Sequence, residues 1–440
     1  MEWQLAILVI LGSLIVLLAS GMPVAFCFLV VDAIGILIWW GGEPGMRQLI
    51  LSAKNSLSSF TLLPIPLFIL MGEVMFQSGL GTNMMEALGK WMGRLPGRLA
   101  LLAVGGGTLF ATLSGSAMAS AAMLGSVLLP EMEKHGYKKS MSLGPILGAG
   151  GLAVMIPPSA MAVVLGSIAQ ISIGRLLMGI IMPGLLMAVL FAAYIILRCW
   201  LQPSVAPPYE VAASPLSEKL RYTVRDILPL GSIVFMIIGL MLLGVATATE
   251  AAATGTLMTF ILAAAYKKLN WGVLKKSALA SVEITVMVFF IIMAAAAFGQ
   301  ILAFSGASTH LSQLATTLPV APMLIIVLMM ILLLILGCFI NTVPIMMITL
   351  PIFMPVVQSL GFNVIWFGVI YMITMEMAPI TPPFGLVLFV VKAIAPPGTT
   401  MADVYRAGLA FIGLDLLALA LVMIFPQIAL WLPGLMQRSA

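Results

Sequence analysis

Residues 156–159 read Ile156-Pro157-Pro158-Ser159, and this double proline interrupts a long apolar run. Two adjacent prolines remove two amide donors and their rings clash with the preceding turn, so a helix cannot continue through them. Inside a lipid bilayer, such a break is tolerated only where the freed backbone groups face protein or a water-filled cavity. Broken apolar segments of this kind point to the binding site of a transporter.

A short polar run, Ser114-Gly115-Ser116, lies upstream of the double proline in the same apolar region. Basic residues flank it on both sides, at Arg94, Arg98, Lys134, Lys138 and Lys139. Because lysine and arginine concentrate in cytoplasmic loops, both ends of this segment are expected on the cytoplasmic side. The segment is therefore predicted to enter the membrane and return, as a re-entrant hairpin with the polar run near its tip. A helix-packing patch of small residues is the alternative interpretation of this run.

The second half of the chain repeats these landmarks in the same order. Pro130 and Pro157 are 27 residues apart, as are Pro355 and Pro382. The other matches, which share with these an offset of 225 to 227 residues, are Gly79 with Gly306, Ser114 with Asn341 and Gly136 with Gly361. Several matches in register indicate a duplicated unit. No basic residue occurs at 319–322 or 358–363, which flank the second polar segment, so the two repeats are expected to be inverted in the membrane.

The composition excludes an ordinary soluble protein. Hydrophobic residues make up 62% of the 440 residues and charged residues 8%, against roughly 25% charged in soluble domains. Apolar runs of about 17 to 25 residues recur along the chain, which predicts a polytopic membrane protein. The net charge of +5 is spread over loops, so it indicates topology rather than a nucleic-acid-binding surface. The cysteines and histidines lack metal-ligand spacing, and no nucleophile–base–acid constellation indicates an enzyme.

The predicted fold is all-α, with two inverted-topology repeats that each contain a re-entrant hairpin and a broken helix. The first repeat covers 1–199 and the second 226–440, and a proline-rich linker at 200–225 is expected on the cytoplasmic side. Predicted spans of the second repeat include 277–304 and 407–425. Residues 44–60 and 81–98 are too polar to span and are expected to be amphipathic helices along the membrane surface.

This arrangement brings four non-helical segments to the middle of the bilayer. Unwound carbonyls and small hydroxyls there can coordinate sodium, while helix N-termini present amide donors to an anionic substrate. Acidic residues at membrane depth are further candidates, because a charged group there is expensive. They are Asp32, Glu73, Glu250, Glu283, Glu376 and Asp415. Glu376 lies just before the second double proline and is expected to touch the site, whereas Glu250 fits a helix cap as well as a coupling carboxylate.

Several segments along nearly the whole chain carry a family resemblance. They are Pro64-Ile65-Pro66-Leu67-Phe68-Ile69-Leu70-Met71-Gly72, Ser114-Gly115-Ser116, the loop 130–137, Ile156-Pro157-Pro158-Ser159, Ser172-Ile173-Gly174, Ala248-Thr249-Glu250-Ala251-Ala252, Thr342-Val343-Pro344-Ile345 and Ile380-Thr381-Pro382-Pro383-Phe384-Gly385. As an ensemble they resemble the large membrane subunit (DctM-like) of tripartite ATP-independent periplasmic (TRAP) transporters.

The resemblance implies a multi-pass protein of the bacterial inner membrane that works as a sodium-coupled elevator. A transport domain bearing both hairpins would move against a scaffold. Sodium ions would be held around Ser114, Gly115 and Ser116 with Pro157, and around Asn341 and Thr342 with Thr381 and Pro383. Substrate would bind near Ser114, Ser159 and Thr381, with Glu376 as a further candidate. Many relatives have aspartate where this chain has Asn341, so a sodium site there relies on neutral oxygens.

The resemblance also implies two protein partners, besides the surrounding membrane lipids. One is a small four-helix membrane subunit (DctQ-like), and the other is a soluble periplasmic binding protein (DctP-like) that delivers an organic acid. The predicted transport domain comprises 99–172 and 321–395. The predicted scaffold comprises 1–98, 173–199, 226–320 and 396–440.

The sequence therefore predicts the large subunit of a sodium-driven importer of a small carboxylate or sulfonate. Two alternatives remain open at this stage. A stand-alone ion-coupled anion carrier would transport without a binding protein, and a passive channel subunit would allow sodium-independent downhill flux.

Overall fold

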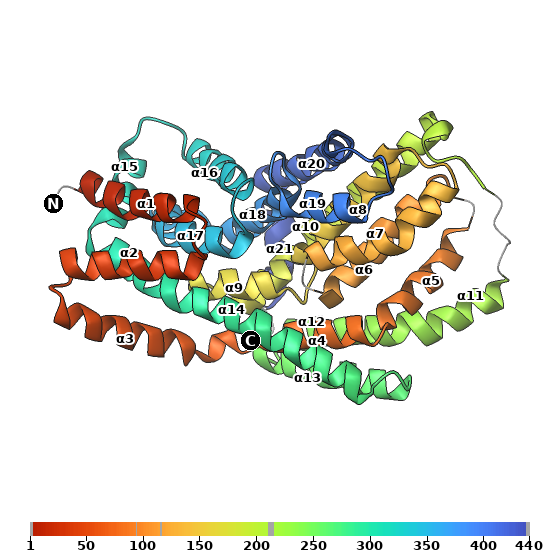
Figure 1. Ribbon diagram of the computed structural model, residues 1–440, viewed down its shortest axis with the longest axis horizontal. Helices are drawn as coiled ribbons and strands as arrows, with labels where there is room; N and C mark the ends of the chain where they lie inside the picture. The colour runs from red at the N-terminus through yellow and green to blue at the C-terminus, as the bar shows by residue number, and fades with distance from the viewer. Residues whose placement is uncertain (1–2, 94, 115–116, 210–214, 437–440) are drawn as a thin grey trace.

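The chain folds into a bundle of helices (Figure 1). A computed structural model describes residues 3–93, 95–114, 117–209 and 215–436, and these ranges contain helices and connecting turns but no strand. Seven helices or continuous helix runs are long and apolar enough to cross a membrane. They are Phe60–Gln77, Ile173–Leu201, Leu216–Leu242, Ala248–Ala265, Trp271–Phe304, Thr342–Ser359 and Met401–Ile424. The prediction of an all-α polytopic membrane protein is thus confirmed.

The first half of the chain supplies the elements up to the linker. These are α1 (Trp3–Ala19), α2 (Val24–Trp39), α3 (Glu43–Leu57), η1 (Phe60–Leu62), α4 (Pro64–Gln77), α5 (Leu80–Met92), α6 (Arg98–Ser114), α7 (Ala117–Lys134), α8 (Lys139–Met155), α9 (Ala160–Ile168), α10 (Ile173–Leu201) and η2 (Pro203–Val205). Helices α8 and α9 together form a further candidate span that is bent by 49° at the double proline.

The second half begins with helix inside the predicted linker. Its elements are α11 (Leu216–Tyr222), the π-helical turn η3 (Thr223–Ile227), α12 (Leu228–Leu242), α13 (Ala248–Ala265), α14 (Trp271–Phe304), α15 (Ala307–Thr317), α16 (Pro322–Gly337), α17 (Thr342–Ser359), α18 (Val364–Met377), η4 (Ala378–Ile380), α19 (Leu386–Ile394), α20 (Met401–Ile424) and α21 (Gln427–Met436).

The landmarks that predicted a duplication have the same local conformation in both halves. Gly79 (φ 68°) and Gly306 (φ 77°) precede α5 and α15. Gly136 (φ 72°) and Gly361 (φ 75°) lie in the turns that follow α7 and α17. Glycine is the residue that adopts a positive φ at least steric cost, so its place in the sequence marks these turns. The elements α5 to α9 and α15 to α19 therefore follow one another in the same order.

Two helices begin six residues earlier than the predicted spans, because polar side chains cap them. Helix α14 starts at Trp271, where the side chain of Asn270 accepts a hydrogen bond from Val273 N. Helix α20 starts at Met401, after a capping box formed by Thr400 and Asp403. Such caps satisfy amides that have no partner inside the helix. Hydrophobic runs alone did not locate these starts, and they did not predict α15 or α21.

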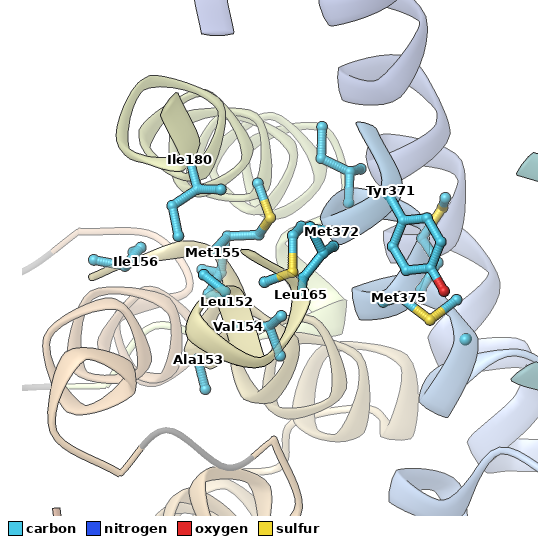
Figure 2. Close-up of a cluster of buried hydrophobic side chains, with 14 of the residues drawn as sticks. Leu152, Ala153, Val154, Met155, Ile156, Leu165, Ile180, Tyr371, Met372 and Met375 are labelled. Atoms are coloured by element: carbon cyan, nitrogen blue, oxygen red, sulfur yellow. The ribbon is translucent and has the colours of Figure 1, made fainter. Parts of the chain in front are cut away.

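Helices α8 and α18 form the centre of the bundle. Every residue of α8 from Met141 to Met155 is buried, and so is every residue of α18 from Ile365 to Met377. A helix that is apolar on all sides belongs in the interior of a large helical protein. Figure 2 shows the end of α8, from Leu152 to Met155, packed with Leu165, Ile180 and Met372, and Ile156 directly after it.

Glycines in α8 let neighbouring helices approach closely. A Cβ atom on Gly148 would lie 2.4 Å from the ring of Phe411 in α20, and one on Gly144 would lie 2.9 Å from Ala407 O. Helix α10 also packs on α8 and α18. The two helices α10 and α20, which the sequence assigned to the scaffold, thus lie against the predicted transport segments. The division into transport domain and scaffold remains a prediction.

A second group of helices packs beside this centre. Helix α4 contacts α13 and α14, and α14 contacts α2 and α3 along its length (Figure 1). The side chain of Glu250 completes a capping box with Thr247 at the start of α13. Of the two roles considered for Glu250, the structure shows the helix cap.

Candidate functional site

The site is built around two short connections between helices and two helix breaks. We call residues 115–116 and 338–341 the first and second tips, and residues 156–159 and 381–385 the first and second breaks. The first tip separates α6 from α7 and the second separates α16 from α17. The breaks separate α8 from α9, and the helix run α18–η4 from α19. Gly115 and Ser116 lie outside the described residues, as does the side chain of Ser114, the last residue of α6.

A small cavity of about 70 Å³, the tip cavity, is lined by the second tip and by residues that flank the first tip and both breaks. Its wall includes Ala117 directly after the first tip and Val154 just before the first break. Ile340 and Asn341 of the second tip line it together with Thr342 at the start of α17, and Pro379 lies just before the second break. Segments that are more than 200 residues apart in the sequence therefore meet at one point. A cavity of this volume has room for an ion or a few waters, but not for an organic acid.

A larger cavity of about 480 Å³, the lateral cavity, adjoins the tip cavity. The two share Met118, Met161 and Asn341 in their walls. The rest of the lateral cavity is lined from two sides. One side comes from α7, the first break, α9 and α17, and the other comes from α2, α4 and α14. Its volume is in the range of sites for small organic molecules.

The walls of both cavities are mainly apolar. Among the described residues that line them, Glu73 of the lateral cavity is the only one with a charged side chain. Its carboxylate accepts a hydrogen bond from Gln77 Nε2 at 3.4 Å. The polar side chains that line the tip cavity are Asn341 and Thr342.

The hydroxyl of Ser159 is engaged within the first break. Its Oγ donates to Val154 O at 2.8 Å and accepts from Ala162 N at 3.3 Å, and the residue is 1% exposed. A serine hydroxyl has one hydrogen and two lone pairs. The hydrogen of Ser159 is therefore used by the chain, and only a lone pair remains. Such an oxygen suits a cation better than an anion.

Thr381 has the same arrangement in the second break. Its Oγ1 donates to Met377 O at 2.8 Å, so its hydrogen is also used. Two further contacts fix the backbone of this break. Pro382 O accepts from Cys338 Sγ of the second tip at 3.3 Å, and Pro383 O accepts from Tyr405 of α20 at 2.7 Å. The contact of Cys338 was not predicted, because nothing in the local sequence distinguishes it from a buried apolar cysteine.

Asn341 holds the start of α17 at both cavities. Its Oδ1 accepts from Thr342 N at 2.7 Å, which caps the helix. The cap leaves the two N–H bonds of the side-chain amide as possible donors. The N-terminus of α17 carries a partial positive charge from its aligned peptide dipoles. An anion in either cavity would therefore meet a favourable field at this point.

Some of the predicted site residues line the cavities, and others lie outside the cavity walls. Asn341 and Thr342 line the tip cavity. The peptide bonds Pro157–Pro158 and Pro382–Pro383 are both cis, and Pro158 lines the lateral cavity. The walls next to Ser159 and Thr381 come from their neighbours Pro158, Ala160 and Pro379. Glu376 packs against Gly151 of α8, behind the tip cavity. The binding roles of all these residues remain predictions.

The helical fold, the candidate spans and the cavities beside the helix interruptions are those of a polytopic membrane transporter. The chain matches the family described as "Tripartite ATP-independent periplasmic transporter, DctM component" over residues 11–428. It belongs to this family, the large permease subunits of TRAP transporters, and is an inner-membrane protein. The predicted resemblance is thereby confirmed.

Two relatives illustrate the range of the family. The C4-dicarboxylate TRAP transporter large permease protein DctM of Pseudomonas aeruginosa is 30% identical over 395 residues, which are 90% of this chain and 91% of the relative. The isethionate TRAP transporter permease protein DctMQ of Oleidesulfovibrio alaskensis is 30% identical over 427 residues, which are 97% of this chain and 66% of that longer relative. These relatives are permeases, which are not enzymes.

A solved structure supports the fold at lower sequence similarity. The YdaH transporter of Alcanivorax borkumensis superposes with a TM-score of 0.62 and 16% identity, covering 87% of this chain and 88% of the other. At this identity the similarity concerns the arrangement of helices alone.

Proposed function

We propose that this chain is the large transmembrane subunit of a sodium-coupled importer for a small carboxylate or sulfonate. The observation that carries this proposal is that the second tip meets residues flanking the first tip and both breaks around the tip cavity. Unwound backbone at membrane depth is tolerated where it lines a cavity, and broken helices commonly build the ion and substrate sites of secondary transporters.

Sodium is assigned to the tip cavity and its immediate surroundings. The ion prefers oxygen ligands, and the available oxygens here are neutral. Ser159 and Thr381 each keep lone pairs after donating their hydrogens to the backbone. Asn341 and the unwound carbonyls of the breaks complete the candidate set. Pro157 and Pro383 act through their backbone oxygens, because proline has no amide donor. Ser114 at the end of α6, together with Gly115 and Ser116 of the first tip, are further proposed ligands.

The organic anion is assigned to the lateral cavity, whose volume of about 480 Å³ suits a small acid. The relatives named for a C4-dicarboxylate and for isethionate suggest a carboxylate or a sulfonate. Since the only charged lining residue is Glu73, the positive field for the anion has to come from elsewhere. The N-terminus of α17 and a sodium ion in the adjoining tip cavity are the proposed sources.

Transport is proposed to follow an elevator mechanism with inverted repeats. The lateral cavity lies between 99–172 and 321–395 on one side and α2, α4 and α14 on the other. Sliding of the first group past the second would carry both cavities across the bilayer. Because α10 and α20 pack against α8 and α18, we propose that these two helices move with the transport segments.

Two partners are proposed from the family: a small membrane subunit and a periplasmic binding protein. The chain should be reconstituted into proteoliposomes with both proposed partners. Uptake should then be measured across a panel of carboxylates and sulfonates, with and without an inward sodium gradient. Uptake that needs the gradient and the binding protein supports the proposal. Uptake without the binding protein would favour a stand-alone carrier, and sodium-independent downhill flux would favour a passive channel.

A crosslink distinguishes whether α20 moves with α8. Lys139 at the start of α8 and Asp403 in α20 form an ion pair at 2.8 Å. In a background without native cysteines, both residues are replaced by cysteine and joined with a short bifunctional reagent. Preserved uptake is expected if the two helices move together. If uptake is lost and is restored by cleaving the crosslink, α20 belongs to the scaffold.

A further inference from the structure

Two acidic side chains are buried next to the centre of the bundle. Glu376 in α18 is 1% exposed and Asp415 in α20 is 0% exposed. Among the described residues, no protein group forms a hydrogen bond with any of their four carboxyl oxygens. Buried polar groups are nearly always hydrogen-bonded, so two such acids require an explanation.

Neighbouring contacts place the two acids side by side. Helices α18 and α20 run antiparallel, because Trp366 Nε1 donates to Val422 O at 2.9 Å while Gly408 faces Ile380 O. Asp415 lies midway between Gly408 and Val422, and therefore beside the last turns of α18. The register of the two helices thus brings the two carboxyls near each other.

Helix α8 packs directly against the side chain of Glu376. A Cβ atom on Gly151 would lie 2.6 Å from Glu376 Cγ and 2.8 Å from its Oε1. Only glycine leaves room for the carboxyl at this position. One turn before Gly151, Gly148 packs against Phe411, which lies one turn before Asp415. Both acids thus face the same stretch of α8.

The charged side chains on the helices that pack around Glu376 and Asp415 lie near the ends of those helices. The titratable side chains of α8, α10, α18, α19 and α20 besides the pair are Lys139, Arg175, Tyr194, Arg198, Cys199, Tyr371, Lys392, Asp403, Tyr405 and Arg406. Helices α9, α16, α17 and α21, which also pack on α18 or α20, carry no charged residue.

The nearest cations along these helices are roughly two turns away or already paired. Lys139 binds Asp403 at 2.8 Å. Arg406 precedes Asp415 by nine residues, roughly 13 Å along the helix. Arg175 is adjacent to Leu176, which packs at Gly368, and Glu376 lies roughly 12 Å further along α18. The hydroxyl of Tyr371 is bonded to Thr349 at 2.8 Å.

Two ionised carboxylates in this position would be prohibitively costly. Moving a single ion into a low-dielectric interior costs several kcal/mol even after relaxation, and two like charges add their mutual repulsion. Either a proton or a bound cation has to offset this cost. A sodium ion needs several oxygen ligands and space around them, whereas Glu376 is held directly against the backbone of α8. A proton needs neither.

We propose that Glu376 and Asp415 form a proton-binding site in which the two carboxyls hold at least one proton at neutral pH. The site lies directly behind the tip cavity: Val154, three residues after Gly151, and Ala378, two residues after Glu376, both line that cavity. The proton stabilises the packing of α8, α18 and α20 that carries the two breaks. This inference goes beyond the proposed sodium and substrate sites and does not depend on them.

Infrared spectroscopy of the purified chain in lipid nanodiscs tests the proposal directly. A protonated carboxyl has a carbonyl stretch distinct from that of a carboxylate, and it shifts in D₂O. The wild-type chain at pH 7 is expected to show such a band, and the Glu376→Gln/Asp415→Asn variant is expected to lose part of it. Glu43→Gln makes the same acid-to-amide change at an exposed residue paired with Arg47, so it should leave the band intact. Identical bands in the wild-type chain and the double variant would overturn the proposal.

Sodium serves as the competing ligand in the same experiment. If the pair is a proton site, saturating sodium chloride leaves the band unchanged, with potassium chloride as the ionic-strength control. Bleaching of the band by sodium but not by potassium would overturn the proposal in favour of a cation site.

Proton release on unfolding provides a second measurement that needs no variant. The unfolded chain ionises both acids at pH 7, so unfolding of the wild-type chain should release about one proton or more. Folding then binds protons, and the thermal stability should fall as the pH rises from neutral to alkaline values. Unfolding at pH 7 without net proton release would contradict the inference even if the double variant does not fold.

Discussion

Replacing Asn341 by aspartate adds one negative charge at the point where the two cavities meet. Asn341 lines both cavities and caps α17 through Oδ1. Aspartate caps helices as well as asparagine does, and its charge is favourable at a helix N-terminus. The substitution should therefore preserve the fold while changing the electrostatic potential of the site.

The size of the effect follows from the dimensions of the tip cavity. A volume of about 70 Å³ corresponds to a sphere roughly 5 Å across. If the new carboxylate keeps the helix cap and the other proposed ligands hold the sodium, the ion lies at most roughly 5–8 Å from the carboxylate, and direct coordination would make the effect larger. At an effective dielectric constant near 20, unit charges at these distances interact by about 2–3 kcal/mol. Since 1.4 kcal/mol is tenfold in affinity, sodium should bind roughly 30- to 150-fold more tightly. Binding of an anion alone should weaken.

Uptake in proteoliposomes with both partners provides the assay. The sodium concentration for half-maximal uptake should fall for Asn341→Asp, and the substrate KM at saturating sodium should change far less. Asn363→Asp is the matched control, because Asn363 caps α18 by accepting from Ile365 N at 2.9 Å and Trp366 N at 3.1 Å. An equal sodium dependence in both variants would refute the assignment of sodium to the tip cavity.

Three further substitutions test individual contacts. Thr381→Val removes the hydrogen bond to Met377 O and a proposed sodium ligand. It should lower the free energy of unfolding by about 1 kcal/mol and weaken the activation of uptake by sodium. The control Thr374→Val loses the same type of hydrogen bond, to Ile370 O, and should lower the stability alone. Gly151→Ala places a methyl group 2.6 Å from Glu376 Cγ. Thermal unfolding should show a destabilisation of about 1–3 kcal/mol. The control Gly231→Ala should not show it, because its Cβ meets nothing within 4 Å. Thr247→Ala breaks the capping box of α13 and should cost about 1 kcal/mol, with the sodium dependence of uptake unchanged.

Each of these three predictions has a clear contrary result. Equal sodium activation in the two threonine variants would remove Thr381 from the ion site. A Gly151→Ala chain as stable as Gly231→Ala would mean that Glu376 has room to move away from α8. A changed sodium dependence of uptake in Thr247→Ala would indicate that Glu250 takes part in sodium coupling.

The helices and their interruptions were predictable because they follow from local chemistry. The adjacent prolines at 157–158 and 382–383 end their helices through local sterics, and the matched glycines specify left-handed turns at 136 and 361. Helix starts were less well predicted where caps decide them. Asn270 and Thr400 extend α14 and α20 beyond the apolar runs, because a side-chain oxygen can satisfy the first amides outside the apolar segment.

The candidate site was predicted only in outline, since its chemistry depends on partners that are distant in sequence. The tips and breaks were recognised as polar interruptions. That the hydrogens of Ser159 and Thr381 are already donated to Val154 O and Met377 O could not be predicted, although it decides which ligand they can accept. The contact between Cys338 and Pro382 O likewise had no signal in the sequence.

The sequence by itself thus determined the membrane-embedded helical class, the doubled order of elements and the positions where helices stop, because backbone sterics and apolar run lengths act within a few residues. Tertiary structure alone decided that α10 and α20 lie against α8 and α18, and that Glu376 packs on Gly151 with Asp415 at the same level of the neighbouring helix α20. In a chain that is apolar on nearly every face, hydrophobicity cannot choose which helices become neighbours. That choice is made by close packing at small residues and by the need to offset the cost of buried charge.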